Sequence, residues 1–286
     1  MVPYMERSDP GTGTTVKAFT AQADAFEDPE RNQVFTADAR WVFDRLALRP
    51  DDLVLDVAAG TGHAARQLAP SVRAVVALDL TPAMLAAGQA AALREGLTNV
   101  IFMRAQAAAL PFLDASFDVV VSRFAAHHFE DPAAVLAEMV RCTRQNGTVA
   151  CVDLVAADAV EVAARQNELE RLRDPSHARM LRAEDTEAML AGAGLGVIDR
   201  TLRPLRRPLR PWLEQTNTAP EVAAAIEAAL QDELAGGAVT GFRPEVLNGE
   251  LWFVQTFGSW VATRPARPRP ARPRPTRPRP ARSQPL

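Results

Sequence analysis

Short apolar runs alternate with longer helix-like stretches along most of this chain, and this alternation limits the fold more than any other feature. The first five runs are residues 53–57, 72–78, 100–103, 117–121 and 148–154, and each precedes a stretch rich in Ala, Leu, Glu and Arg. Because these runs are apolar throughout rather than alternating in polarity, they are typical of parallel strands buried on both faces. The pattern predicts an α/β sandwich.

Local signals predict where two helices begin and which elements come after the fifth strand. Capping residues with proline at the first helical position mark two helix starts, at Thr81-Pro82 and at Asp131-Pro132. The later elements predicted are helices over residues 160–173 and 221–234 and strands over residues 196–202 and 251–257.

Cysteine and hydropathy patterns exclude several classes of protein. The two cysteines, Cys142 and Cys151, cannot build a disulfide framework or a four-thiolate zinc site, which favours a reducing, cytoplasmic location. No run of eighteen apolar residues and no signal-peptide core occurs, so we expect neither membrane insertion nor export. His127 and His128 are adjacent and lack the i, i+4 spacing of helical metal ligands, so no metal site is expected.

Charge is divided unevenly along the chain. Eight of the 32 basic residues lie in residues 264–286, an Arg-Pro alternation with no hydrophobic period, whereas all 35 acidic residues precede it. Such a tail cannot bury a core and is expected to be extended and solvated. It is either an electrostatic arm or a dispensable extension, and we favour the second because the acidic body would repel nucleic acid.

The segment LVLDVAAGTGHAA, residues 53–65, is the most informative motif. A buried strand carries Asp56, and Gly60 and Gly62 then make a tight turn into a helix. Glycine permits close approach of a ligand to the backbone, and a helix N-terminus offers free N–H groups. A dinucleotide-binding loop would need glycines at 58, 60 and 63, where the chain has Ala58, Gly60 and His63. The loop therefore fits a pyrophosphate poorly.

The second strand ends in an acidic residue, as nucleoside-binding folds of this type require. Asp79 follows the glycine turn by about twenty residues, and a carboxylate there can accept both hydroxyls of a ribose. Met84, one turn into the next helix, is a candidate for packing on an adenine ring, although apolar residues at such positions are more often plain core.

Five segments in order resemble class I S-adenosylmethionine-dependent methyltransferases: DVAAGTG, LDLTPAML, LPFLDASFD, RFAAHHF and RDPSH. The similarity is to the small-molecule branch related to the ubiquinone and menaquinone C-methyltransferases and covers roughly residues 16–261. It implies a Rossmann-like fold with a seven-stranded, mostly parallel sheet, helices on both faces and a helical substrate cap. It also implies S-adenosyl-L-methionine as cofactor and S-adenosyl-L-homocysteine as product.

The resemblance also implies which residues hold the cofactor. Asp56 is expected near the methionine ammonium, Asp79 at the ribose and Gln106 at the adenine, where relatives usually carry Asp. The full set expected at the cofactor is Asp56, Ala58, Gly60, Gly62, Asp79, Leu80, Met84, Gln106, Ala107 and Arg123.

Three histidines are candidates for catalysis: His127, His128 and His177. An unperturbed imidazole titrates near pH ~6.5, which suits a general base. Because His127 and His128 are adjacent, only one is expected to point into the cleft while the other helps to fold the loop. His177 lies in the predicted cap, where it is a candidate second base and substrate contact.

Three further side chains are candidates for the acceptor site. Arg173 could bind a substrate carboxylate or phenolate bidentately, or form a local salt bridge with Asp174 while residues 174–176 cap the next helix. Phe19 and Phe26 lie at helical spacing in residues 16–26, a helix that in similar enzymes closes over the cofactor.

The sequence thus predicts a methyltransferase with four parts: an N-terminal segment and lid helix (1–29), a cofactor-binding core (30–157), cap helices and closing strands (158–262) and the tail (263–286). Its partner would be a small-molecule methyl acceptor positioned in line with the sulfonium, with no nucleic acid or membrane and with a homodimer left open. The rival predictions are a NAD(P)-dependent oxidoreductase, disfavoured because Tyr4 is the only tyrosine, and a cofactor-binding fold that does not methylate.

Overall fold

The computed structural model describes residues 10–27 and 40–266. The tail was predicted over residues 263–286, but Thr263 ends the last strand and residues 264–266 are also described, whereas residues 267–286 lie outside the described residues. Residues 1–9 and 28–29 of the predicted N-terminal segment lie outside them as well.

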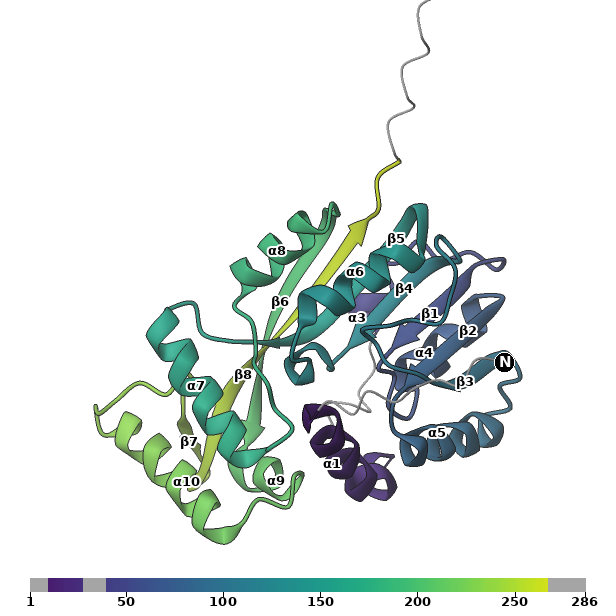
Figure 1. Cartoon of the computed structure of the whole chain (residues 1–286). Coiled ribbons are helices and arrows are strands. Elements are labelled where there is room, and N and C mark those ends of the chain that lie inside the picture. The colour runs from purple at the N-terminus through teal and green to yellow at the C-terminus, as the bar shows by residue number, and fades with distance from the viewer. Residues whose placement is uncertain (1–9, 28–39, 267–286) are drawn as a thin grey trace, which may run out of the picture.

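Seven strands form the central sheet in the order β3-β2-β1-β4-β5-β8-β6 (Figure 1). Their bounds are Leu53–Val57 (β1), Ala74–Asp79 (β2), Val100–Arg104 (β3), Phe117–Arg123 (β4), Thr143–Val155 (β5), Gly196–Pro208 (β6) and Glu250–Thr263 (β8). The first five strands pair in parallel, whereas β8 is antiparallel to both β5 and β6. The predicted mostly parallel, seven-stranded sheet is confirmed, and a short strand β7 (Glu245–Leu247) adds to β8.

The helices begin where the sequence signals place them. Their bounds are Pro10–Phe26 (α1), Arg40–Phe43 (α3), His63–Leu68 (α4), Pro82–Arg94 (α5), Pro132–Cys142 (α6), Val160–Arg173 (α7), Ala183–Gly192 (α8), Leu209–Glu214 (α9) and Pro220–Leu234 (α10). Two 3-10 turns are Ala69–Ser71 and Ala126–His128. Asp131 caps α6 by accepting a hydrogen bond from the Ala134 amide at 2.9 Å, which satisfies one of the free amides of the first turn.

Two apolar layers cover the sheet, one on each face. On one face, Val42 of α3 and Leu68 of α4 pack against strand residues such as Val75. On the other, Met139 of α6 and Leu190 of α8 pack against residues such as Leu55. Burial of both faces explains why the strands are apolar without alternation.

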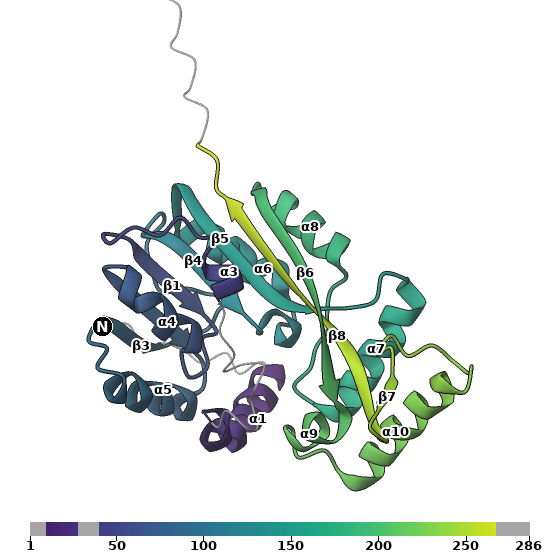
Figure 2. The ribbon, with the colours of Figure 1, turned by 180° about the vertical axis from the view of Figure 1, so that it is seen from behind.

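The cap is built beyond the edge of this core. Helices α7, α9 and α10 lie with β7 around the far ends of β6 and β8 (Figures 1 and 2), and their core includes Trp212, Phe242 and Phe253. The runs predicted at 196–202 and 251–257 are therefore only parts of longer strands. The remainder of β6 is rich in Arg and Pro, so it lacks the apolar signal of a strand and is held by its ladder to β8.

No helix among residues 10–27 and 40–266 has the length and apolar character needed to cross a bilayer.

Candidate functional site

A cavity of about 800 Å³ opens at the carboxyl ends of the parallel strands. Ligands of open α/β sheets bind in the crevice beyond these strand ends. The lining comes from the loops after β1, β2, β3 and β4, from α1 and from the loop after α7. Residues predicted for the cofactor and residues predicted for the acceptor therefore meet in one cavity.

The loop after β1 turns through three residues of positive φ. These are Ala58 at 55°, Gly60 at 57° and Gly62 at 74°. Ala58 and Gly60 line the cavity, but Gly62 does not. A Cβ at Gly62 would lie 2.9 Å from the ring of Phe102. Gly62 is therefore needed for the turn and for close packing, and its contact with the cofactor stays a prediction.

Asp56 presents an unsatisfied carboxylate oxygen to the cavity. Its side chain is buried, and its Oδ2 accepts a hydrogen bond from the Ala65 amide at 3.0 Å. Oδ1 has no hydrogen-bond partner among the described residues. Burial raises the pKa of Asp56 to about 7, although Arg123 acts in the opposite direction. A buried acceptor without a partner is costly, so this atom calls for a donor from a bound ligand.

Asp79 closes the same loop from the next strand. Its Oδ2 accepts a hydrogen bond from the Gly60 amide at 2.8 Å, and its Oδ1 accepts one from the Thr81 amide at 2.8 Å. Burial raises the pKa of Asp79. The carboxylate lines the cavity beside Leu80 and is locked in orientation by two backbone donors.

The residues expected around the adenine divide into two groups. Gln106 and Ala107, after β3, line the cavity. Met84 does not: it is fully buried in α5, outside the lining. Met84 faces the core of the protein, so this placement does not support stacking on the base, which stays a prediction.

Arg123, at the end of β4, brings a cation to the cavity. Its guanidinium carbon lies 4.5 Å from the centre of the Phe124 ring. Burial lowers the pKa of Arg123 to about 10, so the group remains charged at neutral pH. The cavity thus contains an arginine within electrostatic reach of Asp56.

The two adjacent histidines have different surroundings. His128 lines the cavity, whereas His127 is buried behind it. The amide of His127 donates to Asp153 Oδ2 at 3.0 Å, and its Nδ1 lies 2.5 Å from Asp153 Oδ1. Burial opposes a charge on His127, but Asp153 outweighs it and raises the pKa. His127 therefore holds the turn, and its catalytic role stays a prediction that this placement does not support.

His128 is the histidine available to an acceptor. Its Nδ1 lies 3.0 Å from the backbone oxygen of Ser176 and 3.2 Å from the Ser176 hydroxyl. Burial lowers the pKa of His128 to about 4, with a further contribution from His127. At neutral pH the ring is uncharged and retains one nitrogen able to accept a proton.

His177 also lines the cavity, and its orientation is fixed by Asn167 of α7. The Asn167 oxygen accepts a hydrogen bond from the Met180 amide at 2.7 Å and lies 2.9 Å from His177 Nε2. Because that oxygen only accepts, Nε2 carries the ring proton. Burial lowers the pKa of His177 to about 2. His177 is therefore suited to binding a donor as a neutral ring rather than to taking up a proton.

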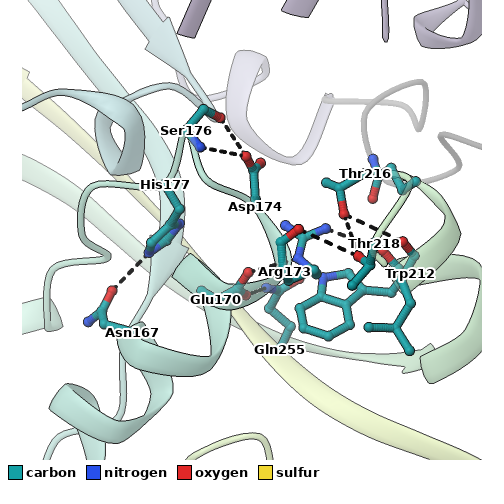
Figure 3. A network of polar contacts seen from close by, with 12 residues as sticks. Asn167, Glu170, Arg173, Asp174, Ser176, His177, Trp212, Thr216, Thr218 and Gln255 are labelled. Carbon is teal, nitrogen blue, oxygen red and sulfur yellow. Dashed lines mark hydrogen bonds and ion pairs between the residues drawn. The ribbon is translucent and has the colours of Figure 1, made fainter. Parts of the chain in front are cut away.

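Arg173 does not line the cavity. It lies beside Glu170 and Trp212 (Figure 3). Its Nε lies 3.1 Å from Glu170 Oε2, and its guanidinium packs 4.4 Å from the ring centre of Trp212. The side chain instead forms a buried ion pair in the cap, so this placement does not support a substrate contact of Arg173, which stays a prediction. Asp174 binds Ser176 instead of a following helix, so the alternative salt bridge with Arg173 is not formed either.

Helix α1 forms a wall of the cavity. Phe19 and Phe26 both line it, and the Phe19 ring lies 5.0 Å from that of His128. The helix is linked to the glycine turn through Glu27, whose two carboxylate oxygens each lie 2.8 Å from Arg66 Nη2 in α4.

Several site residues were not predicted. Thr14 and Thr15 of α1 and Ser176 line the cavity, while Asp153 and Asn167 orient two histidines. Asp153 had a detectable signal, since it is an acidic residue inside the apolar fifth strand. Asn167 had none, and Ser176 lies in the RDPSH segment without a sign of its contact with His128, because both roles depend on segments that meet only in three dimensions. Among the described residues, no group of three or more His, Cys, Asp and Glu side chains is placed to hold a metal ion.

Known proteins share both the sequence around this cavity and its fold. A family model described as a methyltransferase domain matches residues 55–151, from β1 into β5. The methyltransferase YcgJ of Bacillus subtilis, itself uncharacterised, is 34% identical over 170 residues, which cover 59% of this chain and 67% of that protein. A demethylmenaquinone methyltransferase of Renibacterium salmoninarum is 39% identical over 108 residues, 38% of this chain and 44% of that protein.

Solved structures agree with the fold. The BH2331 protein of Bacillus halodurans, assigned as a methyltransferase, superposes with a TM-score of 0.75 and 29% identity, covering 80% of this chain and 99% of that one. The crystal structure of YcgJ superposes with a TM-score of 0.70 and 28% identity, covering 78% and 96%.

Proposed function

This chain belongs to the class I S-adenosylmethionine-dependent methyltransferases, and from that premise we propose that it methylates a small, partly apolar molecule with His128 as general base. The observation that carries the proposal is the joint cavity, in which an unsatisfied carboxylate oxygen and an uncharged histidine line the same space.

The residues of the cavity fit the charges of the cofactor. The free oxygen of Asp56 suits its ammonium, and the cation of Arg123 suits its carboxylate. Asp79 is preoriented for ribose hydroxyls, and Gln106 can accept a hydrogen bond from the adenine amino group through its amide oxygen. When bound, S-adenosylmethionine supplies an electrophilic methyl group.

The acceptor end of the cavity provides position and proton removal. Phe19 and Phe124 supply apolar walls, and His177 supplies a neutral hydrogen-bonding ring. His128 would remove the proton of an acidic O–H, N–H or C–H group as that group reacts. Exclusion of water by α1 and alignment of the acceptor would contribute much of the rate enhancement.

The proposal is tested in two stages. Titration calorimetry with S-adenosylhomocysteine should show binding that Asp56→Asn weakens. Incubation with methyl-labelled S-adenosylmethionine and a panel of quinols, phenols and amines should then transfer label to at least one class. Absence of both heat and thermal shift with S-adenosylhomocysteine would contradict the cofactor assignment. Tight binding with no transfer to any member of the panel would contradict the proposed acceptor class.

A further inference from the structure

We propose that Ser176 and Asp174 are positioning residues that hold His128 with its proton on Nδ1, so that Nε2 is the nitrogen that receives a proton from the acceptor. This inference rests on the proposed function for its catalytic meaning, but the tautomer itself is a property of the protein alone. It concerns a cap segment that packs against the turn after β4.

The hydrogen bonds of Ser176 have one consistent direction. Asp174 Oδ1 lies 2.6 Å from the Ser176 hydroxyl oxygen and 2.9 Å from the Ser176 amide (Figure 3). An ionised carboxylate only accepts, so the hydroxyl proton of Ser176 points to Asp174. Burial raises the pKa of Asp174, but the nearby His128 and the hydrogen bonds from Ser176 lower it, and the pKa is lowered overall. The hydroxyl oxygen is left with lone pairs for His128.

Two acceptors then face one ring nitrogen. His128 Nδ1 lies 3.0 Å from the Ser176 carbonyl oxygen and 3.2 Å from its hydroxyl oxygen. With the proton on Nδ1, both contacts are favourable. With the proton on Nε2, the lone pair of Nδ1 would face two oxygen lone pairs in a buried site. The geometry therefore selects the Nδ1–H form and leaves Nε2 as the basic nitrogen.

The segment that carries Ser176 is itself anchored to the histidine turn. The amides of Ala178 and Arg179 both donate to the carbonyl oxygen of His127, at 2.8 and 3.0 Å. Asp174 and Ser176 are almost fully buried. The cap loop and the turn after β4 thus form one unit, which fixes the distance between Ser176 and His128.

The chemical consequence is a proton transfer from the acceptor to His128, which places a positive charge near the carboxylate of Asp174. The O–H, N–H or C–H bond of the acceptor breaks, its electron pair stays on the acceptor atom, and an Nε2–H bond forms. The positive charge that then lies on His128 is stabilised by Asp174 through Ser176. Asp153 raises the pKa of His127, and a positive charge on His127 disfavours a positive charge on His128. The stabilisation by Asp174 must therefore outweigh this repulsion.

The first measurement is spectroscopic and needs no acceptor. Long-range proton–nitrogen correlation spectra of ¹⁵N-histidine-labelled protein, saturated with S-adenosylhomocysteine at neutral pH, report the tautomer of each ring. The chain has four histidines, and the signals missing in His128→Gln assign the ring of interest. We expect an uncharged His128 protonated on Nδ1. A ring protonated on Nε2, or on both nitrogens, would overturn the inference.

The second measurement is kinetic and uses the acceptor found in the label assay. Ser176→Ala should lower kcat roughly tenfold, the value of one lost hydrogen bond, and Ser176→Thr should restore most of it. The KM for the acceptor and the S-adenosylhomocysteine affinity should stay within about twofold. Asp174→Asn, which keeps an acceptor oxygen but removes the charge, should also lower kcat. Ser259→Ala, a buried serine of β8 outside the cavity lining, is the matched control and should change nothing.

The outcomes separate the two proposals. Unchanged kcat in both Ser176→Ala and Asp174→Asn, with His128→Gln inactive, would refute the positioning role while leaving the base intact. An Nδ1–H tautomer together with full activity of His128→Gln would refute the base and leave the structural assignment standing.

Discussion

Burial shifts pKa values in opposite directions in the two halves of the cavity, the half lined by Asp56 and Asp79 and the half lined by His128 and His177. On the cofactor side, burial raises the pKa values of Asp56 and Asp79 and disfavours their negative charges. On the acceptor side, burial lowers the pKa values of His128 and His177 and disfavours positive charge. Because of desolvation, a bound cation would stabilise the carboxylates of the first half, whereas the neutral histidine rings of the second half can accept a hydrogen bond or a proton from a ligand.

The halves also differ in what holds them. Asp56 is fixed by the amide of Ala65 in α4, and Asp79 by the amides of Gly60 in the loop after β1 and of Thr81 just before α5, all within residues 56–81. His128 and His177 are fixed by Ser176 and Asn167, which lie in or after the cap helix α7. A local motif suffices for the cofactor, whereas the acceptor site requires the cap to fold onto the core.

The largest effect should come from removing the acceptor-side base. His128→Gln is expected to lower kcat by a factor of about 10² to 10⁴, because no side chain then removes the proton of the acceptor. The S-adenosylhomocysteine affinity should change less than about twofold. Calorimetry and the label assay measure the two quantities. His127→Gln provides the contrast and should mainly lower Tm, since His127 holds the loop. Equal loss of cofactor binding in His128→Gln would break the division between the halves.

The next effect tests whether the cap network is structural. Arg173→Ala leaves the fully buried Glu170 without its ion-pair partner, and the unfolding free energy should fall by about 3–5 kcal/mol. Chemical denaturation measures this change, and cofactor affinity of the folded fraction should be retained. Arg200→Ala, which breaks an exposed pair with Glu187, is the control and should cost about 1 kcal/mol or less. A stable Arg173→Ala protein that has lost acceptor binding would restore Arg173 as a substrate ligand.

On the cofactor side, Asp56→Asn should move affinity and stability in opposite directions. S-adenosylhomocysteine binding at pH 8 should weaken roughly 10- to 100-fold through loss of a charged hydrogen bond. The same change removes a buried charge, so the Tm of the ligand-free protein should rise by ~2–4 °C. Asp114→Asn, an exposed carboxylate of the surface, should leave both quantities unchanged. A fall in Tm together with unaltered affinity would contradict the role of Asp56.

A smaller effect is expected from pH. In the proposed function the ionised form of Asp56 binds the ammonium, and the pKa of Asp56 in the ligand-free protein is about 7. Below that value, binding must first remove a proton, so S-adenosylhomocysteine affinity should fall by up to about tenfold per pH unit and level off above pH ~8. Calorimetry between pH 5.5 and ~8.5 checks this. Asp56→Asn should abolish the dependence, and a wild-type profile that rises on acidification would have the wrong sign.

The smallest effect is expected from the Arg/Pro tail, which the sequence predicts to be dispensable for activity. Deletion of residues 267–286 should leave S-adenosylhomocysteine affinity within about twofold at physiological salt, where exposed charges are largely screened. The measurement should be repeated at low salt with and without the tail. A large loss of S-adenosylhomocysteine affinity or of methyl transfer at physiological salt would show that the tail contributes to the site.

Local sequence patterns were enough to predict the parallel sheet, most of its strands and the cofactor loop. Continuous apolar runs are consistent with strands covered on both faces, and Gly60 with Asp56 and Asp79 forms a pattern that depends only on neighbouring residues. The strand ends in the cap were not predictable, because the Arg- and Pro-rich part of β6 is held by pairing rather than by local preference. Met84 and Gly62 were predicted to contact the cofactor, yet neither lines the cavity, because helix and loop positions do not reveal which side a residue faces.

The acceptor half, by contrast, is defined only by long-range packing. Nothing in the adjacent pair His127 and His128 distinguishes a ring held by Asp153 from one that faces the cavity, and Arg173 fits equally well as ligand or as ion-pair partner. The choice depends on residues about 25 to 50 positions away in the chain that meet only when α7 and its loop pack on the strand ends. The physical reason is that proton positions and buried charges are set by every group around them, whichever part of the chain supplies it.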